Sequence, residues 1–454
     1  EILTAASPLA GGTAAEPLIL TAVLSEQTWQ AMVWGVSLEM KGYRDLADDL
    51  TGGLTALVAG QAGFAGIKRG GRAIFWRSGD SDDEELADAV PAPHSELSEG
   101  VQKVYVNDEA FAAIKEGGQV LAWGSRSGGG FISEDVAEQL RSGVKSITHT
   151  AEAFAALKET GEVVTWGHPS FGGNCSRVAE QLVDVVSITG AWGSGDGAFA
   201  ALTANGACVT WGSFGAGGDC REVAEQLRSG VTSISSTASA FAALKDTGAV
   251  VTWGDAEKGG RMEVTWGPPT DEEECSDDGC HEDGESEDHG ETYSVEDRLS
   301  SGVLAVVGSD NVFAALKDTG EVVAWGCAPD GAHLKEDVKR KLSEGAPIKS
   351  ISAATTTFAA LKEDGRVVPW GVIADFGNGF LLDKVEDQLT DVVSVPNMPT
   401  ENVWGMFAIK KTGEVVPIGT IANPPDHIIE DEFRSGVVDV VGNGNSFALL
   451  KRTL

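Results

Sequence analysis

The stretch FAALKETGEVVTWG, residues 154–167, decides the fold because nearly the same sequence is repeated along the whole chain. FAAL and EVVTW are short, apolar and partly β-branched, as strands buried on both faces are. KETG between them is a short loop with a late glycine, which predicts a β-hairpin whose glycine has positive φ. Copies occupy 111–124, 199–212, 241–254, 313–326 and 358–371, weaker ones 64–77 and 407–419, and partial ones 32–35 and 447–451.

One tryptophan ends almost every copy, and the spacing of these residues is regular. Successive tryptophans are 42 to 47 residues apart, with one gap of 72. Core packing explains one large ring per repeat, so we interpret these residues as structural, with ligand stacking as the alternative. The eight are Trp34, Trp76, Trp123, Trp166, Trp211, Trp253, Trp325 and Trp370.

The segments between the hairpins complete a repeating unit. A strand-like piece such as VKSITH precedes each hairpin, and a glycine-rich loop such as SRSGGGF follows it. SEDVAEQLRSGV, residues 133–144, then predicts a short helix with a serine N-cap, acids in its first turn and Gly143 as a left-handed cap. Similar text recurs in later linkers. No unit can bury its apolar faces alone, so neighbours must pack together.

The pattern V-x-S-I, A-F-A-A-L-K-x-x-G, V-V-x-W-G and a later Gly-Gly resembles the repeats of the regulator of chromosome condensation family. The resemblance covers residues 21–454 and implies an all-β propeller, which in that family typically has seven blades. The family often closes the ring with a blade shared by both chain ends. Here WQAMVWG, residues 29–35, and the final FALLK, residues 447–451, could share such a blade.

Several features depart from the family pattern. Its histidine-serine pair before the alanine-leucine strand and its Gly-Gln-Leu-Gly loop are absent, and a short helix is added to each repeat. Nine ends resemble Trp-Gly, so we expect seven to nine blades, with a β-prism or an open solenoid as alternatives. We expect an N-terminal extension over 1–20, one repeat domain over 21–454 and an acidic insertion at 268–297.

The insertion fills the gap of 72 residues. From 271 to 291 it holds twelve acids and no Lys or Arg, so it cannot build a core and reads as a solvated loop, or as an arm that binds a partner. RMEVTWG before it, residues 261–267, looks like an extra strand. A metal site is the weaker interpretation, with the candidate ligands Cys275, Cys280, His281 and His289. A Cys275–Cys280 disulfide is a further option.

Charge bounds the partners. Acids outnumber bases 69 to 33, for a formal net charge of −36. This field repels phosphate backbones, so we expect no nucleic acid; a basic protein or divalent cations would suit it. The sequence has no run of about 18 consecutive apolar residues, so we expect no membrane-spanning helix. The chain opens at Glu1, from which we expect a processed or partial chain, and the compartment, cytoplasmic or organellar, stays undetermined.

Motifs for catalysis are absent. The histidines are scattered, and no phosphate loop or serine elbow is present. Cys175 and Cys220 occupy matching points of two repeats, which repetition explains better than catalysis. The lysine of A-L-K recurs, and we expect the acid in the same turn to neutralise it. We predict no cofactor and no enzyme activity.

Three functions follow. The first is a non-catalytic interaction scaffold that uses variable rim loops, which we place at 168–176, 255–297, 327–334 and 372–382. The second, implied by the resemblance, is a guanine-nucleotide exchange factor for a small GTPase. The third is a peripheral accessory subunit of a large organelle membrane complex, photosynthetic or respiratory.

Overall fold

Each repeat forms one small antiparallel sheet, as the repeat around residue 160 illustrates. β9 (Val144–His149) pairs with β10 (Ala153–Lys158), which pairs with β11 (Val163–Gly167), so that Phe154 lies opposite Trp166. The hairpin glycine, Gly161, has φ of 84°, as the sequence predicts. Residues 153 to 157 are all buried. Both faces of β10 are therefore covered by neighbouring sheets, which is why the strand has no polar alternation.

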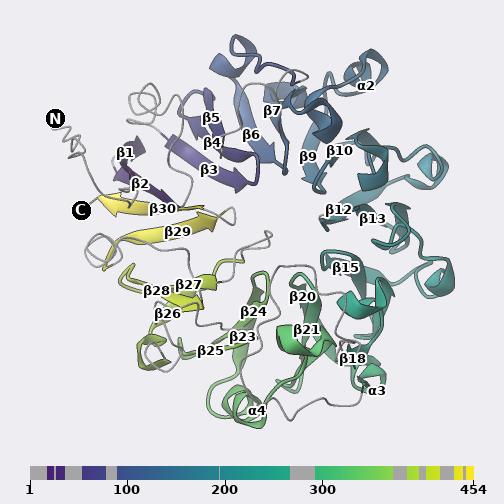
Figure 1. Cartoon of the computed structure of the whole chain (residues 1–454), viewed down its shortest axis with the longest axis vertical. Coiled ribbons are helices and arrows are strands. Elements are labelled where there is room, and N and C mark those ends of the chain that lie inside the picture. Colours follow the sequence, from purple (N-terminus) through teal and green to yellow (C-terminus); the bar gives the residue numbers. More distant parts are fainter. Residues whose placement is uncertain are drawn as a thin grey trace, which may run out of the picture.

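The computed structural model describes residues 18–24, 27–35, 54–77, 89–193, 195–265, 292–371, 386–397, 405–419, 434–442 and 446–453. Within them, nine sheets follow one another around a central axis (Figure 1). Six sheets repeat the three-stranded order above: β3 (Leu54–Gly60), β4 (Gly63–Lys68) and β5 (Ala73–Arg77); β6 (Val101–Val106), β7 (Ala110–Lys115) and β8 (Val120–Gly124); β12 (Val185–Ala191), β13 (Ala198–Thr203) and β14 (Cys208–Gly212); β15 (Val231–Ser236), β16 (Ala240–Lys245) and β17 (Val250–Gly254); β23 (Ile348–Ala353), β24 (Thr357–Lys362) and β25 (Val367–Gly371); β26 (Val392–Ser394), β27 (Gly405–Lys410) and β28 (Val415–Gly419).

The two ends of the chain share one blade, which confirms the expected closure. β1 (Leu18–Leu24) and β2 (Gln27–Gly35) join β29 (Val437–Gly442) and β30 (Ser446–Thr453) in the order β1-β2-β30-β29. Trp34 lies opposite Phe447, the register that Phe154 and Trp166 have in their blade. β2 is therefore the third strand of the last blade, and β1, which begins within the stretch 1–20, adds a fourth.

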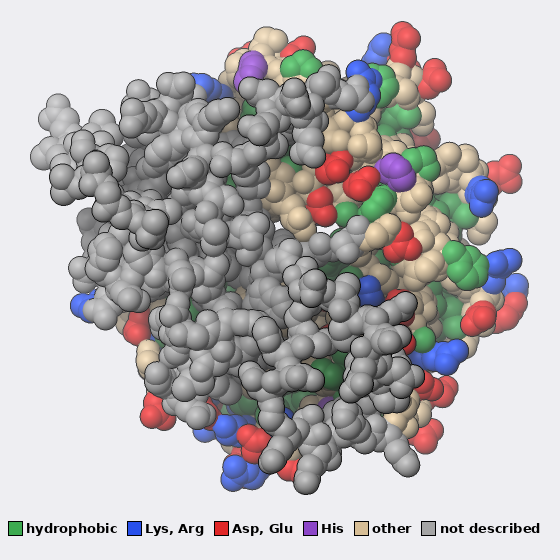
Figure 2. Space-filling view, in the orientation of Figure 1, with side chains coloured by type: hydrophobic (Ala, Val, Ile, Leu, Met, Phe, Trp, Pro, Cys, Tyr) green, Lys and Arg blue, Asp and Glu red, His purple; other side chains and the backbone are tan. Residues whose placement is uncertain are grey.

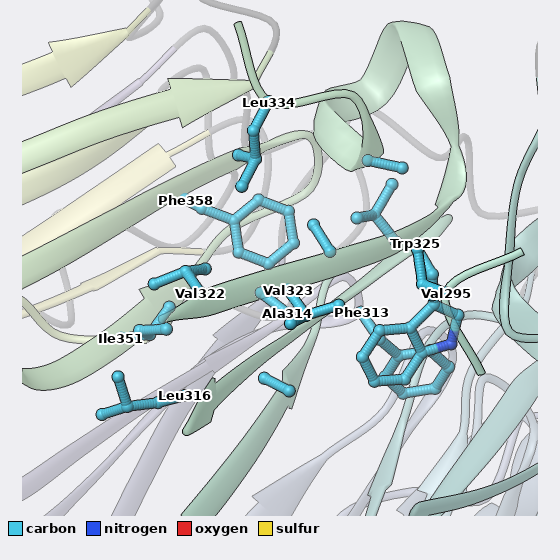
Figure 3. Close-up of a cluster of buried hydrophobic side chains, with 14 of the residues drawn as sticks. Val295, Phe313, Ala314, Leu316, Val322, Val323, Trp325, Leu334, Ile351 and Phe358 are labelled. Carbon is cyan, nitrogen blue, oxygen red and sulfur yellow. The ribbon is translucent and has the colours of Figure 1, made fainter. Parts of the chain in front are cut away.

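One blade has five strands because the flanks of the insertion join it. β20 (Val303–Gly308), β21 (Val312–Lys317) and β22 (Val322–Cys327) form the usual three. β18 (Glu263–Thr265) pairs with β22 in parallel, and β19 (Tyr293–Ser294) pairs with β18. The extra strand expected within 261–267 is thus present, and Val295 is buried beside Trp325 and Phe313 (Figure 3). Residues 266–291, most of the acidic insertion, lie outside the described residues.

The linkers between blades are less uniform than the sequence predicts. α-Helices occur in three of them: α2 (Glu134–Gln139), α3 (Glu296–Leu299) and α4 (Glu336–Ser343). In the described residues of four others, only a 3-10 turn occurs: η1 (Glu96–Ser98), η5 (Ala179–Gln181), η6 (Arg221–Val223) and η9 (Glu386–Gln388). A helix in every repeat is therefore wrong, because such short segments have a weak intrinsic helix preference and packing against the neighbouring blade decides whether a helix forms. Ser133 is the N-cap residue of α2 but its side chain makes no cap hydrogen bond.

The glycine-rich loops form tight single turns after the third strands. They include η3 (Arg126–Gly130), η4 (Pro169–Phe171), η7 (Ala256–Gly260) and η8 (Ala328–Ala332), while η2 (Glu116–Gly118) lies in a hairpin.

Hydroxyl groups also join the first strands of successive blades. Thr189 Oγ1 donates to Ile234 O at 3.2 Å, Ser235 Oγ to Val306 O at 2.7 Å and Ser352 Oγ to Val395 O at 2.6 Å.

The repeated lysine holds the end of the linker in place. Lys158 Nζ donates to Gln139 O at 3.1 Å, at the C-terminus of α2, and Lys317 Nζ donates to Arg298 O at 2.5 Å in α3. Lys115, Lys245 and Lys362 contact Glu96 O, Gln226 O and Glu344 O in the same way. The acid of the hairpin turn adds a weaker contact, such as Lys158–Glu162 at 3.8 Å. Neutralisation by that acid, expected from the sequence, is thus secondary to capping of carbonyl groups.

Replacing one capping lysine tests this role. We expect Lys317→Met to lower the free energy of unfolding by about 1 kcal/mol, because the last carbonyls of α3 lose a charged donor. Lys349→Met, at an exposed position of β23, is the matched control and should change it by less than about 0.5 kcal/mol. Denaturant unfolding measures both, and equal effects of the two variants would contradict the capping role.

Candidate interaction surface

Phe-Trp stacks lie between neighbouring blades. The ring centroids of Phe199 and Trp211 are 5.3 Å apart and those of Phe313 and Trp325 are 5.2 Å apart, in stacked geometry. Six repeat tryptophans are at most 5% exposed: Trp123, Trp166, Trp211, Trp253, Trp325 and Trp370. The side chains of Trp34 and Trp76 lie outside the described part of the structure.

The glycine loop of one blade covers the stack of the next. Trp211 Nε1 donates to Gly172 O at 3.0 Å, and Gly172 has φ of 89°. A Cβ atom at Gly172 would lie 2.6 Å from Cδ2 of Phe199, so glycine permits the close contact. Trp166, Trp253 and Trp325 bond to Gly129, Gly217 and Gly259 in the same way. These rings hold blades together and leave no face open to a ligand.

In the blades whose turns and loops the structure describes, the turns after the first strands and the loops after the third strands come to the same end. Hydrogen bonds join the two within a blade: Asn107 Nδ2 donates to Gly128 O at 2.8 Å, and Thr150 Oγ1 to Phe171 O at 2.8 Å. Backbone bonds continue to the next blade, as from Asp310 N to Thr355 O at 3.0 Å. We call this surface the turn face. It comprises the turns 107–109, 150–152, 192–193 with 195–197, 237–239, 309–311 and 354–356 and the loops 125–130, 168–173, 213–218, 255–260 and 327–332.

The turn face is acidic. Its segments carry eight acidic side chains and two basic ones, Arg126 and Lys258. Figure 2 shows Asp and Glu side chains gathered beside the central opening. Seven of the eight acids are half-buried: Asp108, Glu109, Glu152, Asp196, Asp255, Asp310 and Asp330. Held carboxylates of one sign around an opening produce a focused negative potential.

The centre of this patch lies where three blade ends meet. Burial raises the pKa of the Glu152 carboxyl, the charge of Glu109 raises it further, and His168 lowers it. His168 N donates to Glu152 O at 2.9 Å, which ties the glycine loop to the turn. Ser127 Oγ donates to Glu109 Oε2 at 3.3 Å, and Ser213 Oγ donates to Asp196 Oδ2. A cation at this place would relieve the repulsion between the two glutamates.

The contact surface predicted from the sequence lies in the glycine loops and does not include the acids of the turns. The loop segments 168–176 and 327–334 do contribute to the turn face, whereas 372–382 lies outside the described residues. The signal for the turns was present, since Glu109 and Glu152 each directly precede an Ala-Phe pair. Only the blade arrangement shows that these positions meet.

The other candidate residues give no chemical centre. Cys275, Cys280, His281 and His289 lie outside the described residues, within which no group of three metal-binding side chains occurs. Cys175 packs against the core beside Trp211. Burial raises the pKa of the Cys327 thiol to about 12. Among the described helices, none has the length and apolar character that a membrane crossing needs.

Strand pairing and the shared blade define an all-β propeller that is closed by its own ends. The chain is similar to several solved structures at low sequence identity. Yeast RCC1 (Prp20) bound to Kap60 matches 100% of this chain with 96% of its own, at 14% identity and a TM-score of 0.43. Prp20p from Saccharomyces cerevisiae matches 95% of this chain with 93% of its own, at 14% identity and a TM-score of 0.41. Its structure is described together with its binding to Gsp1p and histones. Human WBSCR16 matches 88% of this chain with 86% of its own, at 13% identity and a TM-score of 0.35.

Sequence comparison gives no closer relation: no family model and no curated protein matches the chain. The blade assignment therefore rests on the strand pairing of this chain itself.

Proposed function

We propose that the protein is a non-catalytic interaction scaffold whose turn face binds a basic segment of a protein partner. The observation that carries this proposal is the set of seven half-buried acids on that face. Their side chains are held by short turns, so little conformational entropy is lost when a partner binds. Rigid blades with functional loops at one end are a common arrangement for recognition.

Electrostatics supports a cationic partner. The net charge of −36 attracts basic proteins over several ångströms and repels nucleic acids and anionic membranes. Half-buried carboxylates are screened less by salt than exposed ones, so the turn face contributes more than its share of this attraction. Lys and Arg side chains of the partner would approach Glu109 and Glu152.

Neutralising three acids tests the proposal. We expect Glu109→Gln with Glu152→Gln and Asp196→Asn to weaken binding of a fluorescein-labelled octalysine peptide by about tenfold, since each lost charge removes roughly 0.5 kcal/mol. The same triple variant should also lose the protein partners that the intact chain retains from its source extract. Fluorescence anisotropy and affinity purification with mass spectrometry are the measurements.

A matched control carries the same change in net charge at the other end of the blades. Glu159→Gln, Asp246→Asn and Asp318→Asn alter exposed hairpin acids outside the turn face. This control should bind octalysine within about twofold of the intact chain. If both triple variants weaken binding equally, only the overall charge matters and the turn face is not the site.

The non-catalytic part of the proposal has its own test. A nucleotide-exchange assay with a panel of small GTPases should show no stimulation by the intact chain. Stimulated release of guanine nucleotide from any of them would replace the scaffold with an exchange factor.

A further inference from the structure

A groove follows the outer edge of one blade. It has a volume of about 1540 Å³ and runs along the whole of β14, from Cys208 to Gly212. One wall is the linker that precedes this blade, residues 176–184, and the other includes the start of the linker that follows it, residues 218–228. The groove shares parts of the loops 168–173 and 213–218 with the turn face, but its lining includes none of the seven half-buried acids of that face.

Two apolar side chains in the groove are open to solvent. Phe214 is 72% exposed and Val183 is 59% exposed, among the most exposed large apolar residues that the structure describes. Arg221 lies 5.9 Å from the centre of the Phe214 ring and forms an ion pair with Asp219 at 2.5 Å. The lining holds three arginines and three acids, so the groove is electrically balanced in a strongly acidic chain.

The end of β14 offers backbone groups to this groove, where Gly212 is exposed, whereas Thr210 is only 6% exposed. Thr203 N donates to Ala207 O at 2.9 Å, so every second residue from Ala207 along β14 bonds to β13 through its backbone. The backbone N–H and C=O groups of Cys208, Thr210 and Gly212 therefore point away from β13, towards the groove. Cys208 N already donates a hydrogen bond to Leu227 O at 2.9 Å. Within the described residues, Thr210 N and O have no backbone partner, although Thr210 Oγ1 donates to Gly218 O.

Four of the described blades close or block the equivalent edge. α2 packs on β11 and α4 packs on β25, while Val90 bonds to Gly124 on β8. β25 and β28 carry Pro369 and Pro417 where β14 has Thr210, and proline on an edge strand prevents further pairing. The linker beside β14 has only the turn η5, too small to cover it.

One blade shows what fits this edge. β18 lies on β22 in parallel, with Val264 opposite Gly326 and Thr265 opposite Cys327. Val264 is 0% exposed there, while Glu263 before it is half-buried. An extended segment with alternating apolar and polar residues therefore pairs with the end of the third strand on a blade of the same sequence pattern, at the positions that correspond to Gly212 of β14 and Ser213 after it.

We propose that the edge of β14 binds an extended segment of a partner protein, which adds to the blade as a parallel fourth strand. Its backbone pairs with the end of β14, from Gly212 back to Thr210, and apolar side chains at alternate positions cover Phe214 and Val183. The segment resembles Met262–Thr265 in pattern and needs no net charge, because the groove has none. This surface goes beyond the scaffold function proposed above and depends on neither the acids nor a basic partner.

The test uses the full chain and a fluorescein-labelled peptide of sequence RMEVTWG, residues 261–267 of this protein. We expect saturable binding in fluorescence anisotropy that changes by less than about twofold between 0.05 and 0.5 M NaCl, because pairing is through the backbone. Thr210→Pro should weaken it by about tenfold or more. The proline at the same position in β25 and β28 indicates that the blade tolerates it, and a thermal melt checks this.

Two further variants make the result decisive. Thr252→Pro, the matching change on β17, should leave peptide binding as in the intact chain. Phe214→Ser, at a position 72% exposed, should fold normally and weaken binding several-fold, so it decides the question if Thr210→Pro does not fold. The proposal is overturned if the intact chain binds no peptide up to about 1 mM (roughly −4 kcal/mol), or if a folded Thr210→Pro or Phe214→Ser variant binds as the intact chain does.

Discussion

Phe199→Ala should lower the free energy of unfolding by about 3–5 kcal/mol, among the largest effects of any single substitution in this protein. Phe199 is 0% exposed and packs between Trp211 of its own blade and Gly172 of the preceding one. Removing the ring leaves a cavity at a joint of rigid strands that cannot collapse to fill it. Denaturant unfolding followed by tryptophan fluorescence measures the change.

Two companion variants separate the parts of this joint. Phe214→Ala removes the same ring at a site 72% exposed and should cost less than about 0.5 kcal/mol. Trp211→Phe keeps an aromatic ring but loses the hydrogen bond from Nε1 to Gly172 O, and should cost roughly 1–3 kcal/mol for the unpaired carbonyl and the smaller ring. A cost for Phe199→Ala no greater than that for Phe214→Ala would show that the blades do not depend on the stack.

This joint marks what the sequence could and could not provide. The phenylalanine, turn glycine and tryptophan of each hairpin were visible as a repeated pattern, and with them the strand pairs and the shared blade. Which glycine contacts which ring was not visible. In one case Trp325 bonds to Gly259 across 66 residues, because the insertion separates them in sequence but not in space.

Local sequence also failed to separate the linkers. The sequence VAEQL occurs in α2 and again in segments that overlap η5 and η6, yet only the first copy forms an α-helix. Packing against the neighbouring blade decides such short segments, because their intrinsic preference is weak. The acidic turn face could not be predicted for a related reason: Glu109, Glu152 and Asp196 are single residues in three consecutive repeats, and only the packing of neighbouring blades places them on one surface.

Removing residues 1–35 should have the largest effect of all, because it opens the ring. β2 pairs with β30 over eight positions, so the deletion removes a ladder worth roughly 4–8 kcal/mol at about 0.5–1 kcal/mol for each bond. The edge of β30 then becomes free to pair with other chains. We expect a lower unfolding midpoint and concentration-dependent aggregation, measured by thermal melts and light scattering.

A peptide should repair the deleted protein if closure is the cause. A synthetic peptide of residues 16–35, which holds β1 and β2, should bind the shortened chain, raise its unfolding midpoint and suppress aggregation. The intact chain should not bind it, because its own β2 occupies β30 at a far higher effective concentration. A scrambled peptide of the same composition should have no effect on either protein. If the shortened chain unfolds at the same midpoint as the intact one, the shared blade does not hold the ring together, and the remaining blades must be stable as an open array.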